Sequence, residues 1–273
     1  MGLAHWLAHP ATRGMDVDDP RTTDLRRAIV SKKAFLRRIY TEWHQALLAA
    51  LPAGDEPVLE VGSGAGFLEK SLPGAITSEV FVLPGVRAVL DGSALPFLAG
   101  SLRGIVMTDV LHHVPRPRAF FSEAARCLRA GGVVAMVEPW NTPWSRFVYR
   151  YLHHEPFDAQ AESWEFPATG PLSGANGALP WILFERDRDR FEAEFPELRI
   201  RSITPTMPFS YLLSGGFSRF TFATAWSGRA WRGLETLLRP CDRHFAMFAV
   251  IVLEKVSARW RSGGFPLSSK TGP

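Results

Sequence analysis

The feature that most constrains this chain is a short apolar strand that runs directly into a glycine-rich turn. Residues 57–61 read Pro-Val-Leu-Glu-Val, residues 62–66 read Gly-Ser-Gly-Ala-Gly, and a helical stretch is expected over 67–72. Glycines let a backbone approach a ligand closely, and the first turn of a helix offers unpaired N–H groups. The segment therefore predicts a nucleotide-binding turn at the carboxyl end of a buried strand.

The glycine spacing separates two kinds of nucleotide site. Dinucleotide-binding folds carry Gly-x-Gly-x-x-Gly, and Phe67 stands where the third glycine of that pattern is required. The sequence therefore disfavours an NAD(P)-dependent oxidoreductase, which we keep only as a minor alternative.

Strand-like and helix-like segments alternate along most of the chain, which predicts a parallel sheet with helices on its faces. Too few residues separate the second and third strands to hold a crossover helix. The expected strands cover 57–61, 76–81, 86–90, 104–107, 133–137, 198–203 and 245–254. The expected helices cover 25–51, 116–129, 181–195 and 228–238, the first capped by Thr23 or Asp24 and the second ended by a turn at 130–132.

Four segments resemble, in family order, motifs of class I S-adenosylmethionine (SAM)-dependent methyltransferases of the broad UbiE/type-11-like group. Residues 60–66 resemble the first motif, 91–97 the D-A-x-x-L-P-F segment, 109–114 the LHH segment, and 123–132 the segment E-x-x-R-v-L-k-p-G-G. The resemblance implies an α/β fold with a Rossmann-like, seven-stranded methyltransferase sheet. That sheet is mostly parallel with an antiparallel last strand, and an N-terminal helix and a cap insertion are added to it.

The resemblance also implies SAM as cofactor. The 62–66 backbone would hold the amino and carboxylate groups of its methionine end, Glu79 its ribose hydroxyls, and Asp91 with the Gly92 N–H its adenine. Glu79 has a simpler reading as a solvated glutamate, and Asp91 as a turn or capping aspartate. The expected cofactor-binding residues are Glu60, Gly62, Ser63, Gly64, Gly66, Glu79, Asp91, Gly92 and Asp109.

Methyl transfer depends mainly on holding the acceptor in line with the methyl group and excluding water, and an oxygen or nitrogen acceptor can also need a base. Candidates follow the fourth and fifth strands, where ligands bind in such sheets. We favour His112 for the acceptor side, with His113 in a supporting role, although both histidines could simply be packed or capping. The expected catalytic residues are His112, His113, Glu138 and His154, with Asp109 and Glu155 also considered.

No metal site is expected. The run His153-His154-Glu155 resembles a ligand set only superficially, because neighbouring side chains point apart and no distant partner is evident. The two cysteines, Cys127 and Cys241, form no ligand spacing and are expected to be free thiols in a reducing cytoplasm.

Residues 139–180 are rich in proline, glycine and aromatic residues, and we expect a long insertion there rather than a helix. The aromatic content argues against disorder and predicts a cap over the active site. The expected organisation is a loose N-terminus over 1–20, a single domain over 21–261 that includes this cap, and a flexible tail over 262–273.

Charge and composition narrow the partners. A net charge of +4 is too small to indicate nucleic acid, and no nucleic-acid-binding motif accompanies it. The basic residues concentrate over 26–38, where a solvated helix face is the simplest interpretation and a membrane surface or an acidic substrate the alternative. No signal peptide or membrane-spanning run is evident, so a cytoplasmic protein is expected.

Two classes of function stay open. The first is SAM-dependent methyl transfer to a small molecule, on oxygen, nitrogen or carbon, and the nine tryptophans and the aromatic cap hint at an apolar, aromatic or lipid-linked acceptor. Core packing is the simpler explanation for these tryptophans. The second class is a non-catalytic protein of the same fold that binds a partner through its basic helix and cap. The oligomeric state is left open.

Overall fold

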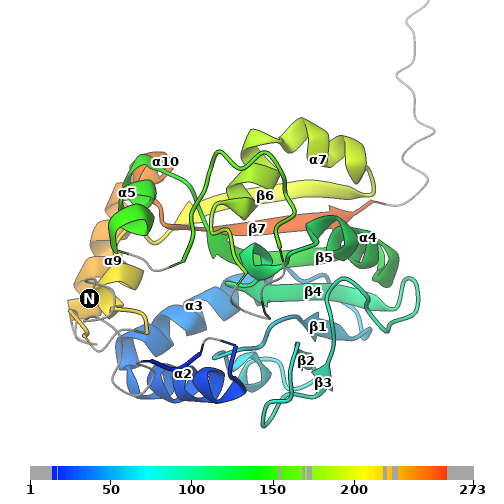
Figure 1. Cartoon of the computed structure of the whole chain (residues 1–273), viewed down its shortest axis with the longest axis horizontal. Coiled ribbons are helices and arrows are strands. Elements are labelled where there is room, and N and C mark those ends of the chain that lie inside the picture. Colours follow the sequence, from blue (N-terminus) through cyan, green and yellow to red (C-terminus); the bar gives the residue numbers. More distant parts are fainter. Residues whose placement is uncertain are drawn as a thin grey trace, which may run out of the picture.

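One seven-stranded sheet organises the molecule (Figure 1). The computed structural model describes residues 14–16, 18–152, 155–167, 170, 174–217, 220–222 and 227–256. Along the sheet the strand order is β3-β2-β1-β4-β5-β7-β6. The strands are β1 (Val58–Glu60), β2 (Ile76–Glu79), β3 (Ala88–Val89), β4 (Leu102–Thr108), β5 (Leu128–Pro139), β6 (Leu198–Thr206) and β7 (Phe248–Lys255).

The strand directions confirm the sheet expected from the sequence. The pairs β1–β2, β2–β3, β1–β4 and β4–β5 are parallel, whereas β7 is antiparallel to both of its neighbours, β5 and β6. Strand order reverses between β1 and β4. In open α/β sheets a ligand crevice forms outside the carboxyl ends of the strands at such a point. The glycine-rich turn and the segment that begins at Asp109 both emerge there.

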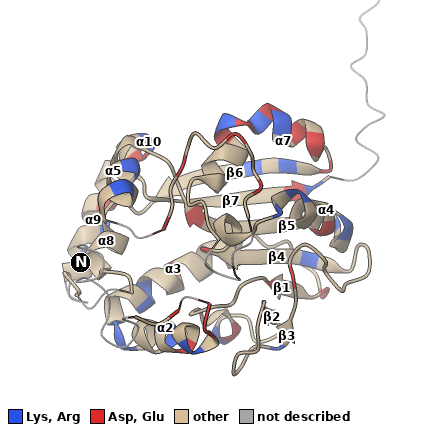
Figure 2. Ribbon diagram, in the orientation of Figure 1, with Lys and Arg blue, Asp and Glu red and all other residues tan. Residues whose placement is uncertain are grey.

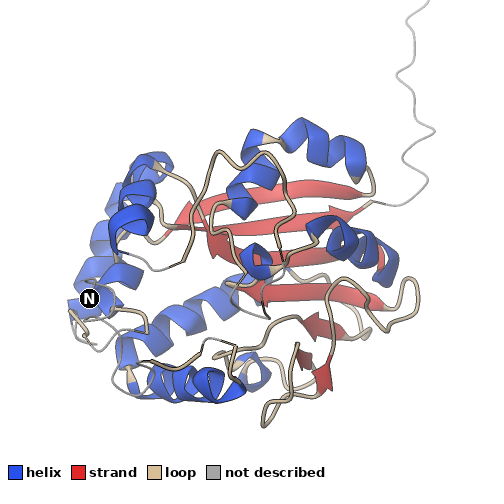
Figure 3. Cartoon of the chain, in the orientation of Figure 1, coloured by secondary structure: helices blue, strands red, loops and turns tan. Residues whose placement is uncertain are grey.

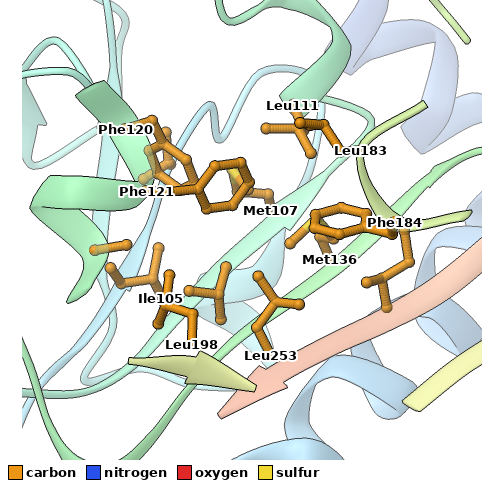
Figure 4. Packing of buried hydrophobic residues seen from close by; sticks show 14 of the residues in the cluster. Ile105, Met107, Leu111, Phe120, Phe121, Met136, Leu183, Phe184, Leu198 and Leu253 are labelled. Atoms are coloured by element: carbon orange, nitrogen blue, oxygen red, sulfur yellow. The ribbon is translucent and has the colours of Figure 1, made fainter. Parts of the chain in front are cut away.

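Both faces of the sheet are buried along its central strands, as parallel strands in such a sheet require. Because successive side chains point to opposite faces, Ile105 and Met107 enter one apolar cluster and Val106 enters the other. The first cluster also contains Phe120 and Phe121, which Figure 4 shows beside Met107. The second cluster includes buried side chains of helix α3 (Ala34–Ala50).

Helices cover both faces (Figure 3). Helix α3 supplies Leu36, Ile39, Trp43 and Leu47 to one cluster, while α4 and α7 supply aromatic side chains to the other. The helices are α2 (Pro20–Lys32), α3 (Ala34–Ala50), α4 (Pro117–Cys127), α5 (Pro143–Leu152), α6 (Leu179–Trp181), α7 (Arg188–Glu194), α8 (Ser210–Ser214), α9 (Ser227–Leu238) and α10 (Asp242–Phe245). Short turns of other helix types lie at Leu68–Lys70, Leu111–His113, Ile182–Arg186 and Arg239–Cys241.

The prediction of one helix over 25–51 is wrong, because the helix begins earlier and is broken. Helix α2 starts at Pro20 and is capped by Asp19, which accepts a hydrogen bond from the Arg21 N–H. Lys33 has an extended ψ of 93° and separates α2 from α3. From that position its ammonium donates to the carbonyl oxygens of Gly216 and Phe220.

Two further boundaries differ from the sequence prediction. The expected helix over 67–72 is only the 3-10 turn Leu68–Lys70, because the chain reaches Pro73 and β2 too soon for a full helix. The turn expected at 130–132 lies inside β5. There the partner register shifts between Leu102 and Gly104, and Gly131 has a φ of 73° that accommodates the irregularity.

The expectation of no helix within 139–180 is also wrong, because this segment contains α5. Its proline, Pro143, stands at the first position of the helix, where the missing N–H costs nothing. Val148 and Tyr149 are buried on its inner side. The last strand begins at Phe248 instead of residue 245 because residues 242–245 form α10.

Charge is distributed without a large field of one sign. Figure 2 shows acidic and basic residues interspersed along α2 and α7. Among the described residues, no helix has the length and apolarity needed to cross a bilayer. The expected loose N-terminus falls largely on residues 1–13, and the expected tail falls entirely on 257–273. Both ranges lie outside the described residues.

Candidate active site

A cavity of about 470 Å³ lies at the carboxyl ends of the central strands. Its wall includes the 60–66 segment after β1, the 79–80 and 90–92 segments after β2 and β3, and the 108–110 segment after β4. The structure thus brings together every cofactor-binding residue expected from the sequence. It also places acceptor-side candidates on the wall of the same cavity.

The glycine-rich turn needs its glycines for two different reasons. Gly62 and Gly64 have φ angles of 66° and 44°, in the left-handed region that other residues rarely adopt. A Cβ at Gly62 would lie 2.6 Å from Cγ2 of Val110, whereas a Cβ at Gly64 would meet no protein atom closer than 3.6 Å. Gly62 is therefore required by packing, and Gly64 leaves open space on the cavity side.

Glu60 and Ser63 link the turn to the sheet. The Ser63 hydroxyl donates to Oε2 of Glu60 over 2.6 Å and accepts from the Ser78 N–H over 3.1 Å. Burial raises the pKa of Glu60 to about 7. A buried carboxyl of this kind favours a positively charged group beside it.

Glu79 and Asp91 lie on the wall beyond the turn. Glu79 accepts hydrogen bonds from the N–H groups of Gly64 and Val80, at 2.8 and 3.0 Å, and burial raises its pKa. Partial burial acts to raise the pKa of Asp91, but hydrogen bonds from Ser93 and Arg116 lower it overall. Both carboxylates keep lone pairs that a ligand could use.

Helix α2 contributes to the site, which the sequence interpretation of a solvated basic face missed. Thr23 and Arg26 line the cavity. Arg27 donates to the carbonyl oxygens of Gly64 and Pro84, at 3.0 and 2.7 Å, and so ties the glycine-rich turn to the loop after β2. No spacing in the sequence distinguishes these arginines from their exposed neighbours.

The side of the cavity expected to receive an acceptor is built on the turn Leu111–His113 and on Glu138 at the end of β5. Oε1 of Glu138 accepts from the N–H groups of Val110 and Leu111, and Oε2 lies 2.8 Å from Nδ1 of His112. Glu138 is fully buried. Its carboxylate therefore positions the turn and His112, and it has no exposed surface in the cavity.

The two histidines differ in their access to the cavity. His112 has no exposed surface and does not line the cavity, whereas His113 and Glu155 do. Nε2 of His112 lies 3.6 Å from Glu155, and Nε2 of His113 lies 4.0 Å from it. His113, which was expected only to support His112, is thus the histidine that lies on the cavity wall.

The pKa values of His112, His113 and Asp109 are shifted in different ways. Burial acts to lower the pKa of His112, but the nearby carboxylates, Glu138 first, raise it well above its usual value. Burial lowers the pKa of His113 to about 4, helped by the charge of His112. Burial raises the pKa of Asp109 to about 7, and this residue has a φ of 63°, a strained backbone of the kind found at functional sites.

Aromatic side chains form much of the remaining wall. Tyr40, Tyr149, Tyr211, Phe217 and Phe248 line the cavity. They come from α3, α5, the 210–217 region and β7, segments that sequence spacing does not connect. His154, an expected catalytic candidate, lies outside the described residues.

The strand order, the single antiparallel strand and a cavity under a glycine-rich turn define the Rossmann-like methyltransferase fold. Residues 59–136, less than half of the chain, match the family model described as methyltransferase domain. The match runs from β1 to β5 and includes the residues that build most of the cofactor side. The UbiE-like subgroup stays a prediction.

No curated protein matches the sequence. Among solved structures, the chain is similar to geranyl diphosphate C-methyltransferase from Streptomyces coelicolor A3(2), at 15% identity and a TM-score of 0.49, covering 91% of each chain. It is similar to a putative methyltransferase in complex with the Haloferax volcanii Trm112 activator, at 12% identity and a TM-score of 0.49, covering 85% of this chain and 98% of that one. It is also similar to a putative methyltransferase from Bacillus halodurans C-125, at 16% identity and a TM-score of 0.42, covering 78% and 96%.

Proposed function

We propose that this protein is a SAM-dependent methyltransferase that acts on a small molecule. The observation that carries the proposal is one cavity with two kinds of wall. Gly64 leaves space beside a left-handed turn on one part of the wall, and His113 and Glu155 lie on the wall of the same cavity. A protein that only binds SAM needs the first kind of wall, and the second kind adds polar groups that can orient an acceptor.

The residues of the cofactor side fit SAM. The backbone of residues 62–66 and the buried carboxyl of Glu60 suit the amino acid end and its positive charge, and Glu79 and Asp91 suit the hydroxyl and amino donors of the nucleoside. Bound there, SAM supplies a methyl group on a sulfonium, which is electrophilic and leaves behind a neutral thioether. The turn that follows residue 66 is too short to add a helix N-terminus, so the loop itself must hold the ligand.

The acceptor side orients the second substrate and excludes water. Tyr149, Tyr211 and Phe217 give this wall an apolar, aromatic character, which suits an acceptor with an apolar, aromatic or lipid-linked portion. His113 and Glu155 are polar groups on the cavity wall, and either can hold or receive a proton at an acceptor oxygen or nitrogen. Glu138 and His112 lie behind them and are fully buried.

The partner-binding alternative finds less support in the basic helix. Arg27 and Lys33 are engaged by carbonyl oxygens of the chain itself, and Arg26 lines the cavity. Side chains used in this way are not presented to a partner.

Calorimetric titration with SAM and with its demethylated product tests the cofactor half of this proposal. Incubation with methyl-labelled SAM and an extract of the source cells, followed by identification of the labelled product, tests the enzyme half. Stoichiometric SAM binding and one labelled small molecule are expected. Absence of SAM binding would overturn the proposal and favour the partner-binding alternative.

A further inference from the structure

The geometry points to a metal site on the acceptor wall: we propose that His112, His113 and Glu155 hold a transition-metal dication whose open positions face the cavity and take oxygen atoms of the acceptor. The second half of this inference rests on the proposed function. The first half concerns the chain alone.

Two neighbouring histidines converge here although side chains adjacent in sequence usually diverge. The turn Leu111–His113 is a 3-10 turn. It brings the imidazole rings of His112 and His113 together, with centroids 4.2 Å apart. One ligand atom from each of the two histidines and from Glu155 lies within 4.8 Å of the others. Metal–nitrogen and metal–oxygen bonds of about 2.0–2.2 Å place ligand atoms roughly 3–4 Å apart, so small side-chain movements complete the set.

In both imidazoles the Nδ1 atom lies beside an oxygen atom of the protein. Nδ1 of His112 lies 2.8 Å from the Glu138 carboxylate, and Nδ1 of His113 lies 3.3 Å from the carbonyl oxygen of Gly174. Each Nδ1 therefore carries a proton, and each Nε2 is the atom left to coordinate. Because nearby carboxylates raise the pKa of His112, its Nε2 releases a proton to solvent when the cation binds. A carboxylate or carbonyl behind a histidine is the usual support of a metal-binding imidazole, since it fixes the tautomer and increases basicity.

The burial of Nε2 of His112 is a second, independent observation that points to the same place. Nε2 of His112 is buried and has no hydrogen-bond partner among the described residues. The nearest Glu155 oxygen, at 3.6 Å, is too far for a hydrogen bond. A buried polar atom that makes no hydrogen bond destabilises the folded state. A cation between Nε2 and Glu155 would satisfy it.

The donor set selects the kind of ion. Two imidazoles and one carboxylate suit Zn²⁺, Fe²⁺ or Co²⁺ better than Mg²⁺ or Ca²⁺, which prefer oxygen. Three protein ligands leave at least one coordination position open, as in catalytic sites. Because His113 and Glu155 line the cavity, this position faces the acceptor space. The ligand class it selects is a molecule with an exposed hydroxyl, carboxylate or phosphate oxygen.

Co²⁺ is the best probe because its visible absorption reports coordination without any enzyme assay. Chelator-treated protein should bind one equivalent of Co²⁺ with new visible bands, and Zn²⁺ should displace it. Glu155→Gln and His113→Gln change side chains that are partly exposed and should weaken Co²⁺ binding at least about tenfold without loss of folding. The matched control is His244→Gln, which changes an exposed histidine in α10.

Three results would overturn the metal site. These are less than one equivalent of Co²⁺ at millimolar concentration, spectra unchanged in both cavity variants, or loss of binding only when the neighbouring pair His153 and His154 is changed to glutamine. Acetohydroxamate, a small oxygen chelator, should alter the Co²⁺ bands, and unchanged bands would overturn the open position that faces the cavity.

Titration of the same samples with S-adenosylhomocysteine separates the two proposals. If the protein binds S-adenosylhomocysteine but does not bind Co²⁺, the metal site is overturned and the proposed function stands. Binding of Co²⁺ without this ligand supports the metal site and overturns its role in methyl transfer.

Discussion

The side of the cavity that we propose for the cofactor is shaped by backbone, whereas the side that we propose for the acceptor is shaped by side chains. Gly62 and Gly64 define the first through φ angles and through the absence of a Cβ. The second depends on a chain of contacts from Glu138 to His112 and on to Glu155, residues that come from separate segments. A backbone-defined site can be recognised from a short motif, and a side-chain-defined site needs the tertiary fold.

The largest effect should come from the backbone side. Gly64→Val should weaken SAM binding by at least about 100-fold, which corresponds to about 2.7 kcal/mol, because the new side chain fills space meant for the ligand. The protein should still fold, since a Cβ there meets no atom closer than 3.6 Å and only the left-handed φ is costly, by about 1–2 kcal/mol. Calorimetry and thermal unfolding measure the two effects separately.

Two control variants sharpen this test. Gly74→Val has open space around its Cβ and an ordinary φ, and it should change neither measurement. Gly62→Val places a Cβ 2.6 Å from Val110 and should destabilise the protein before any ligand is added. Parent-like SAM affinity in folded Gly64→Val would mean that the cofactor does not contact this turn.

A smaller effect, confined to the acceptor side, is expected from Glu138→Gln. The amide keeps an acceptor for the Val110 and Leu111 N–H groups but removes the charge behind His112. Loss of such an outer partner typically weakens metal binding by about 10–100-fold. Co²⁺ affinity should fall by that factor, while SAM affinity should stay unchanged.

Glu235→Gln is the matched control for this variant. Glu235 is also buried, and it accepts hydrogen bonds from the Phe209 and Ser210 N–H groups. None of these three residues lines the cavity. Both variants should lower the melting temperature, but only Glu138→Gln should lower Co²⁺ affinity. Equal Co²⁺ affinity in the two variants would reduce Glu138 to a structural role.

The same contrast explains how far the sequence could predict this molecule. The mostly parallel sheet and its antiparallel last strand were implied by the motif order, and a turn that a ligand can approach closely was indicated by the glycine spacing. The strand order and the left-handed φ angles of Gly62 and Gly64 were not predicted. The prediction of a helix over 67–72 was wrong because the segment between β1 and β2 is too short to hold one. The glycine motif carries no information about the length of that segment. The helix α5 was missed because Pro143 reads as a breaker although the first turn tolerates it.

The acceptor side could be predicted only in part. The LHH segment identified His112 and His113, but not that a 3-10 turn would bring their rings together or that His113 would be the one on the wall. The contact between His112 and Glu138 joins residues 26 positions apart through paired strands. Arg26 and Arg27 resemble any basic helix residues until α2 is seen against the glycine-rich turn.

The smallest expected effect concerns Glu60, whose carboxyl group lies beside the glycine-rich turn. Burial raises the pKa of Glu60 from 4.5 to about 7. Without ligand, stability should therefore fall as pH rises from 4.5 to 7, because the unfolded carboxyl loses its proton first and the folded one later. A cationic ligand beside Glu60 favours the ionised carboxylate and lowers the pKa of Glu60, so ligand binding releases a proton below about pH 7.

SAM affinity should thus rise by about tenfold from pH 6 to pH 8 and then level off. Calorimetry in buffers of different ionisation enthalpy measures the proton directly. In Glu60→Gln the proton release and most of the pH dependence should disappear, whereas a slope equal to that of the parent would assign the titration to another group, with Glu79 the next candidate.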